Sequence, residues 1–247
     1  MDGYGRGFLR MTPVVKNIIL INVVMFVAYW IGFRAFNFDL NSVLGIYFPK
    51  SDSFMPVQIL SHMFMHHDFM HIFFNMYALF MFGSALESVW GPKRFLIYYI
   101  VTGLGAVLLH EMVIALEYNK LVHLLSPDQV QMVINEGGSL LAEGKEYADS
   151  TLKALQELLN TPTVGASGAV FGILLAFGVL FPNTQLMIIF PPIPIKAKYF
   201  VLFYGALELI LAVTQRGSNI AHFAHVGGML FGYLLIRYWR KTSKTLY

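Results

Sequence analysis

Six long apolar segments constrain the fold of this chain more than any other feature of its sequence. Their approximate bounds are 15–35, 69–90, 94–116, 165–181, 199–215 and 219–239. A helix of about 20 apolar residues spans a bilayer, whereas an open sheet in lipid would leave backbone groups without hydrogen bonds. We therefore predict an all-α membrane protein, with a bundle of six transmembrane helices forming a single domain over residues 1–247.

The composition agrees with a membrane protein and argues against other classes. Apolar residues make up 57% of the chain and charged residues 13%, which does not fit a soluble domain. The chain has no cysteine, so neither a disulfide nor a cysteine-based metal site can form. We attribute the net charge of +3 to membrane topology and predict no nucleic-acid partner.

Lysine and arginine gather on one side of the predicted membrane. That side holds 11 of the 17 basic residues, namely Arg6, Arg10, Lys16, Lys93, Arg94, Lys196, Lys198, Arg237, Arg240, Lys241 and Lys244. Such an excess marks the cytoplasmic side of a membrane protein. We therefore expect cytoplasmic termini, with 1–14 as a cytoplasmic N-terminal segment, in a multi-pass protein of a bacterial inner membrane.

Two long connections fall on the opposite, outer side. Residues 36–67 form an aromatic loop, either in the membrane interface or as a cover over the bundle. Residues 117–163 form an acidic insertion between the third and fourth predicted helices, and its leucines at 152, 155, 158 and 159 follow a helical period. This insertion is predicted to form one or two helices on the extracytoplasmic surface.

A serine between glycines begins the fourth apolar segment, in the run Gly165-Ala166-Ser167-Gly168. A helix that starts near Pro162 would hold Ser167 in its first turns, inside the apolar layer, where a hydroxyl needs a partner. Gly165 and Gly168 allow another backbone to approach closely, and Gly172 shares a helix face with Gly168. The run predicts either a nucleophile site or a helix-packing motif alone.

The last apolar segment offers a partner for this serine. His225 lies one helical turn before Gly228, and Gly232 continues the same small-residue face. His225 can therefore lie where this face meets the Gly168 face, within reach of Ser167. His222 is a second candidate without the matching glycines, and either histidine could instead bond a carbonyl.

The second apolar segment carries further polar groups near its start. His71 and Asn75 are four residues apart and project from one helix face, where both can donate hydrogen bonds to a developing oxyanion. His62 and His66 lie at the entry to this helix. They could structure the preceding loop by hydrogen bonds or, alternatively, belong to a metal-binding histidine cluster.

Together these segments resemble the rhomboid family of intramembrane serine proteases. The resemblance rests on Gly-x-Ser-Gly at 165–168, on Ala224-His225-x-x-Gly228-x-x-x-Gly232, and on the series His62, His66, His71 and Asn75. The pattern Gly83-x-x-x-Glu87 also matches, and the resemblance covers about 15–116 and 163–240.

The resemblance implies a role for each matching residue. Ser167 would be the nucleophile and His225 the general base and acid, without a required carboxylate. His71 and Asn75 would stabilise the oxyanion, Phe171 would pack on His225, and His66 would brace the outer loop. The sequence offers no obvious acid beside His225. Glu208 in the fifth segment lies outside the family pattern; it could bond a neighbouring helix or line the substrate gate, and we favour the structural bond.

The sequence therefore predicts a serine endopeptidase that cleaves transmembrane helices of other membrane proteins near their outer end, without a metal or cofactor. The fifth segment would act as the lateral gate for these substrates in the lipid bilayer. One alternative is a catalytically silent rhomboid-like protein that binds membrane clients. Another is a transporter or channel that uses the intramembrane histidines.

Overall fold

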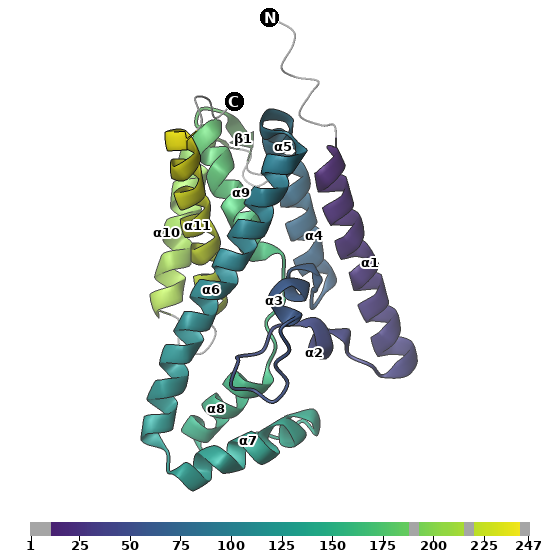
Figure 1. The fold of residues 1–247 in the computed structure, drawn as a ribbon, viewed down its shortest axis with the longest axis vertical. Coiled ribbons are helices and arrows are strands. Elements are labelled where there is room, and N and C mark those ends of the chain that lie inside the picture. Colours follow the sequence, from purple (N-terminus) through teal and green to yellow (C-terminus); the bar gives the residue numbers. More distant parts are fainter. Residues whose placement is uncertain (1–10, 188–192, 215–219, 243–247) are drawn as a thin grey trace, which may run out of the picture.

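The computed structural model describes residues 11–187, 193–214 and 220–242, and this part of the chain is mostly helical (Figure 1). The predicted transmembrane segments correspond to helices in the described residues. These helices are α1 (Pro13–Phe36), α4 (Phe69–Ala78) continued by the π-helical turn η2 (Leu79–Gly83) and α5 (Ser84–Trp90), α6 (Pro92–Leu124), α9 (Ser167–Leu180), α10 (Ala197–Thr214) and α11 (Ile220–Thr242).

Four helical segments in the described residues are long and apolar enough to cross a membrane: Pro13–Phe36, Phe69–Trp90, Pro92–Leu124 and Ala197–Thr214. Helix α9 is apolar but has only 14 residues, and α11 has 23 residues. The helical membrane architecture is thus confirmed, while the count of six spans stays a prediction.

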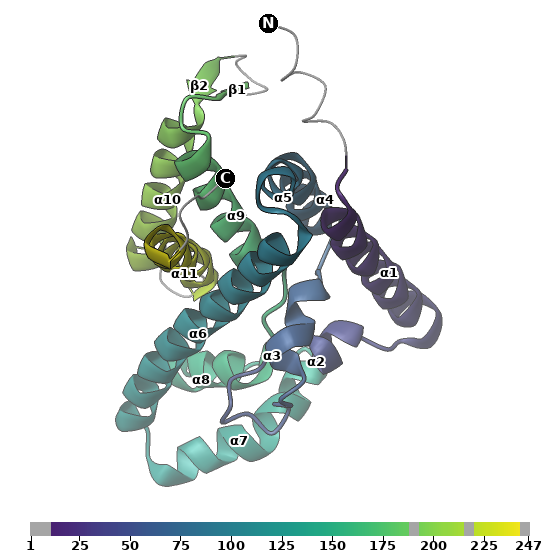
Figure 2. The ribbon, with the colours of Figure 1, turned by 45° about the horizontal axis from the view of Figure 1, so that its top comes forward.

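The arrangement of the helices agrees with the predicted placement of both chain ends on one side. The first turn of α1 and the last turn of α11 lie at the same end of the bundle (Figure 1). Figure 2 shows α1 on the opposite side of the molecule from α10, with α6 running between them. Which end faces the cytoplasm stays a prediction.

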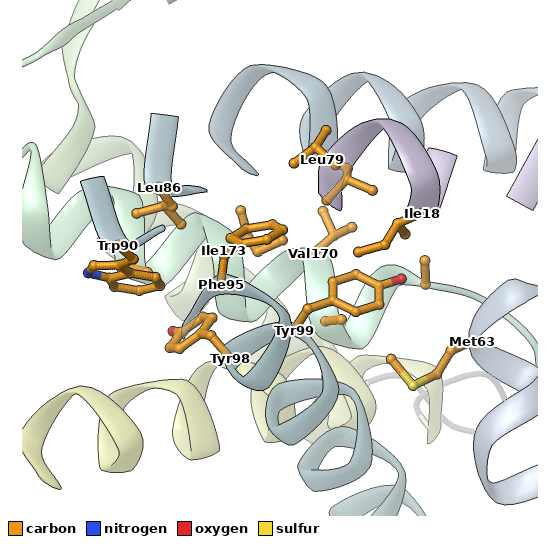
Figure 3. Packing of buried hydrophobic residues seen from close by; sticks show 14 of the residues in the cluster. Ile18, Met63, Leu79, Leu86, Trp90, Phe95, Tyr98, Tyr99, Val170 and Ile173 are labelled. Carbon is orange, nitrogen blue, oxygen red and sulfur yellow. The ribbon is translucent and has the colours of Figure 1, made fainter. Parts of the chain in front are cut away.

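Helix α9 is the centre of the bundle. Most of its side chains are buried, and it packs against α6, α11, α10 and the α4–α5 segment. Figure 3 shows Ile18, Leu79 and Phe95 from other helices in one cluster with Ile173 of α9. Because α9 is enclosed by other helices, residues at its first turn are held in place from several directions.

Glu87 joins α5 to the start of α1. Its carboxylate is 2% exposed and accepts hydrogen bonds from the backbone N–H groups of Val14 at 3.0 Å and Val15 at 2.9 Å, and from the hydroxyl of Thr12. These N–H groups have no acceptor within their own helix, and a negative charge there complements the helix dipole. Glu87 therefore fixes α1 against the bundle.

Residues 117–163, for which one or two helices were predicted, contain α7 (Pro127–Ala142) and α8 (Ser150–Asn160) after the end of α6. Helix α6 runs eight residues beyond the predicted end at 116, because its last turns pack with these helices around Ile114, Leu121, Val133 and Leu155. Phe48 of the preceding loop joins the same cluster. The insertion thus covers the end of α6 opposite to α5 (Figure 1).

The loop between α1 and α4 is organised around one buried side chain. It contains α2 (Leu40–Leu44), α3 (Gln58–Ser61) and the 3-10 turn η1 (His62–Phe64). The Gln58 amide accepts from Met55 N–H at 3.0 Å and donates to the carbonyls of Val43 at 3.1 Å and Ser53 at 2.9 Å. A single glutamine therefore holds three parts of the loop together.

One element corrects the all-α prediction. Strands β1 (Gln185–Met187) and β2 (Pro194–Lys196) form a small antiparallel sheet between α9 and α10, paired as Gln185 with Lys196. This hairpin follows the last turn of α9 at the end of the bundle, where its outer backbone groups can reach water. The apolar period of the sequence does not distinguish so short a pairing from a loop.

Candidate active site

The fourth predicted helix begins five residues later than Pro162, at Ser167 itself. The preceding segment is extended: Thr163 pairs with Ile46 through backbone hydrogen bonds of 2.9 and 2.8 Å. Gly165 has φ of 137° and donates its N–H to the carbonyl of His62 at 2.9 Å, and neither feature is compatible with a helix. Ser167 therefore occupies the first helical position.

Ser167 and His225 lie within hydrogen-bonding distance of each other. The Ser167 Oγ and His225 Nε2 atoms are 2.9 Å apart, although the two residues are 58 positions apart in sequence. This is the geometry that a hydroxyl nucleophile and its general base need. The pairing predicted from the two glycine-rich segments is thus present in the structure.

The close approach of α9 and α11 depends on Gly168 and Gly228. A Cβ atom built on Gly228 would lie 1.8 Å from the Gly168 carbonyl oxygen, so the two backbones touch there. The next glycines on the same two helix faces meet side chains of α6. Gly172 contacts Thr102, and Gly232 contacts Tyr98, both on α6.

An aromatic stack covers one face of the His225 ring. The Phe171 ring is parallel to the imidazole within 9°, with centroids 4.1 Å apart, as the resemblance implied. Tyr204 of α10 stacks on Phe171 in turn, at 5.2 Å and 6°. This packing restricts rotation of the imidazole and holds Nε2 toward Ser167.

An acid lies next to His225 although the sequence pattern indicated none there, and the structure corrects this point. Glu208 of α10 places Oε2 2.8 Å from Nδ1 of His225 and 2.6 Å from Nδ1 of His222. Its side chain is 7% exposed. The signal in the sequence was an acid inside an apolar segment, but no spacing rule connects position 208 to position 225. Ser167, His225 and Glu208 therefore form a chain of polar contacts across α9, α11 and α10.

His71 lies beside the serine because Gly165 has no side chain. A Cβ atom on Gly165 would lie 3.0 Å from His71 Nε2 and 3.5 Å from Ser167 Oγ. The imidazole and the hydroxyl thus meet the same side of Gly165. One turn further along α4, Asn75 is buried, and its amide donates to the His71 carbonyl at 2.9 Å. The second amide hydrogen of Asn75 is not needed for that bond.

His66 and His62 lie in the loop that leads into this helix. His66 is fully buried, its ring meets that of His71 at 4.8 Å, and its carbonyl accepts from Asn41 Nδ2 at 3.3 Å. Burial, with additional effects of His71 and His67, lowers the pKa of His66 to about 3. His62 Nδ1 bonds the Gln58 carbonyl at 2.9 Å. The hydrogen bond of the His62 ring agrees with a loop-structuring role for that side chain, whereas His66 contributes its backbone carbonyl and the packing of its buried ring.

A small cavity adjoins Ser167 on the side of α6. Its volume is about 30 Å³, and its lining includes His62, His110, Thr163 and Ser167. The imidazole of His110 and the hydroxyl of Thr163 are 2.9 Å apart at its wall. A cavity of this size with several polar groups has room for a water molecule.

Comparison with known proteins agrees with this architecture. A family model described as the rhomboid domain matches residues 53–242. The chain is 23% identical to the putative rhomboid protease YdcA of Bacillus subtilis, over 92% of this chain and 89% of that protein. It is 26% identical to rhomboid protease AarA of Providencia stuartii, over 70% of this chain and 52% of that one.

Relatives also come from mitochondria. Rhomboid protein 1 of Saccharomyces cerevisiae is 26% identical over 72% of this chain and 40% of its own length. The chain spans only about half of the mitochondrial relatives that it matches. These proteins give no support to the predicted bacterial inner membrane. With the matched model extending over most of the sequence, this chain belongs to the rhomboid family.

Proposed function

We propose that this protein is a serine endopeptidase that cleaves transmembrane segments of other membrane proteins. The observation that carries the proposal is the 2.9 Å contact between Ser167 Oγ and His225 Nε2. Membership of a family with members named as proteases supports it. In this account α9 and α11 also cross the membrane, which gives six spans, and the insertion around α7 and α8 lies on the outer side.

The contacts of His225 define the direction of proton transfer. A carboxylate only accepts hydrogen bonds, so the His225 Nδ1 atom next to Glu208 carries the hydrogen. Nε2 of the neutral ring is then an acceptor, and it can take the proton of Ser167 as Oγ attacks the scissile carbonyl carbon. The imidazolium that forms is stabilised by the Glu208 carboxylate, and it next protonates the leaving amine.

The negative oxygen of the tetrahedral intermediate would meet donors from two elements. Ser167 is the first residue of α9, so its backbone N–H has no acceptor within that helix. The His71 imidazole lies on the same side of Gly165 as Ser167 Oγ, and Asn75 follows on the same face of α4. In serine proteases one such donor lowers the activation free energy by about 3–4 kcal/mol.

Hydrolysis of the acyl-enzyme requires water within the bundle. The cavity beside Ser167, between His62, His110 and Thr163, can store a water molecule close to the acyl carbon. His225 would take a proton from this water and return it to Ser167. Side chains, backbone and water supply every group in this cycle.

The substrate class follows from where the site lies. Ser167 is at the end of α9 that faces the outer loop and the insertion, so cleavage would occur near the outer end of a membrane-spanning helix. A regular helix hides its carbonyls in its own hydrogen bonds, and residues that weaken the helix would favour cleavage. The predicted gate, α10, carries Glu208, so a large displacement of α10 would also break the Glu208–His225 contact.

Purified protein in liposomes with a model single-span substrate tests the proposal. We expect wild type to produce two fragments, and Ser167→Ala and His225→Ala to leave the substrate intact. Gly144→Ala, in the exposed turn between α7 and α8, serves as a matched control that should cleave normally. If the folded wild type binds substrates with a range of membrane sequences and cleaves none, the silent client-binding alternative is the better description.

A further inference from the structure

Glu208 has a second histidine partner that the proposed reaction does not use. His222 lies one turn before His225 on α11, and its Nδ1 is 2.6 Å from the same Glu208 oxygen that contacts His225. The ligand atoms of Glu208, His222 and His225 all lie within 4.8 Å of one another. If Glu208 served only to orient His225, its contact with His222 would not be required.

The donor set is the one that zinc prefers. Two imidazole nitrogens and one carboxylate oxygen, with a water molecule in the fourth position, make a common protein zinc site. Zinc bonds such ligands at about 2.0–2.1 Å in a tetrahedron, so the ligand atoms stand about 3.3 Å apart. The distances from Glu208 Oε2 to Nδ1 of His222 and of His225, 2.6 and 2.8 Å, would have to lengthen by about 0.7 and 0.5 Å.

The site is closed by protein on one side and accessible on the other. The Glu208 side chain is 7% exposed, whereas His222 and His225 are 20% and 19% exposed. The Phe171 ring covers one face of His225 and limits its rotation. His222 and His225 both lie on α11, so a single helix fixes the relative positions of two of the three ligands.

We propose that Glu208, His222 and His225 form a zinc site whose occupation switches the active site off. A metal on Nδ1 of His225 uses the lone pair of that nitrogen, and the single hydrogen of the neutral ring must then be on Nε2. That nitrogen can no longer accept the proton of Ser167. Binding of the metal is independent of the proposed function, and only the effect on rate rests on it.

Direct zinc binding tests the site itself. Tag-free protein in micelles, freed of metal by a chelator, is titrated with Zn²⁺ by calorimetry and with Co²⁺ as a spectroscopic probe of tetrahedral coordination. Wild type and the inactive Ser167→Ala variant should each bind one equivalent with the same affinity. His222→Gln should bind at least about tenfold more weakly, since loss of even an indirect partner of a metal ligand costs about ten- to a hundredfold.

The matched control is His67→Gln, which removes an exposed histidine of the separate His62–His71 region. It should bind zinc as wild type does. Wild type that binds no zinc at micromolar concentration, His222→Gln that binds normally, or His67→Gln that abolishes binding would each overturn the site.

The switch is then tested by cleavage assays with and without Zn²⁺. Zinc should inhibit wild type, and a chelator should restore its rate. His222→Gln, compared with its own metal-free rate, should resist inhibition at least about tenfold better. Stoichiometric zinc binding to an active wild type that leaves its rate unchanged would contradict the switch. A wild type without any activity would instead refute the proposed function, while the calorimetry still decides the site.

Discussion

The Glu208 carboxylate lies 2.8 Å from Nδ1 of His225, on the opposite side of the imidazole from Ser167. This contact places a third polar residue behind a pair that the family resemblance described as sufficient alone. It links the catalytic geometry to α10, the helix that the sequence marked as the substrate gate. Three helices must therefore be correctly packed for one proton transfer.

Glu208→Gln should lower kcat by at least about a hundredfold, with a much smaller change in KM. The amide can donate to Nδ1 and so favour the wrong tautomer, a change that costs about 10⁴ in kcat in a soluble serine protease. Glu208→Asp keeps the charge and should recover part of the rate. Cleavage kinetics over a range of pH values would check this, and equal rates for all three proteins would show that Glu208 has a structural role only.

Gly165→Ala should abolish most activity while the protein stays folded. Its φ of 137° disfavours a side chain, and the new Cβ would lie 3.0 Å from His71 Nε2. Strain of this kind costs about 1–3 kcal/mol. Gly144→Ala, also at positive φ but with no atom within 4 Å, separates backbone strain from the His71 contact. Thermal unfolding and cleavage rates should be measured for both variants, and Gly165→Ala should lose much more activity than Gly144→Ala. Equal losses of activity in the two variants would contradict a role for the His71 contact.

Gly228→Ala should separate α9 from α11 and destabilise the bundle. The added Cβ would meet the Gly168 carbonyl at 1.8 Å, and both atoms belong to the backbone or are fixed to it. Overpacking costs about 1–3 kcal/mol, and more where nothing can move. At Gly205 the added Cβ would meet only the end of the Met229 side chain, at 2.7 Å, and that flexible chain can shift. Gly205→Ala should consequently keep its melting temperature and its activity, and similar losses in both variants would count against the close helix contact.

Stability should fall as the pH drops below about 6.5, in part because of His66. Burial lowers the pKa of His66 to about 3, so between these values the unfolded chain binds the proton and the folded chain does not. One such group reduces the free energy of unfolding by about 1.4 kcal/mol per pH unit as the pH falls through this window. His66→Gln should show a shallower pH dependence in equilibrium unfolding monitored by circular dichroism. The same slope in both proteins would show that His66 is not the group responsible.

The sequence predicted much of this site because its signals are local. The glycines around Ser167 and after His225 mark a close helix contact, and His71 and Asn75 share a face by their spacing alone. Apolar run lengths predicted the helices to within a few residues, except at the end of α6, where packing against α7 and α8 extends the helix. The predicted start of α9 failed because the pairing of Thr163 with Ile46 links residues that are distant in sequence.

Glu208 shows the limit of such reasoning. Its contact with His225 joins α10 to α11, and Tyr204 of α10 also stacks on Phe171 of α9, so the position of Glu208 depends on packing between residues distant in sequence. For a related reason, the sequence did not indicate that Gly172 faces Thr102 and Gly232 faces Tyr98, since only the folded chain shows how α6 packs against α9 and α11. In both cases the contacts depend on how helices distant in sequence pack together, which the residue types alone do not indicate.

Covalent labelling with a fluorophosphonate probe, followed by mass spectrometry of the modified peptide, tests the central claim most directly. We expect an adduct on Ser167 in wild type, none in Ser167→Ala, and strongly slowed labelling in His225→Ala. A folded wild type that remains unlabelled, or labelling of Ser167 at the same rate without His225, would contradict it.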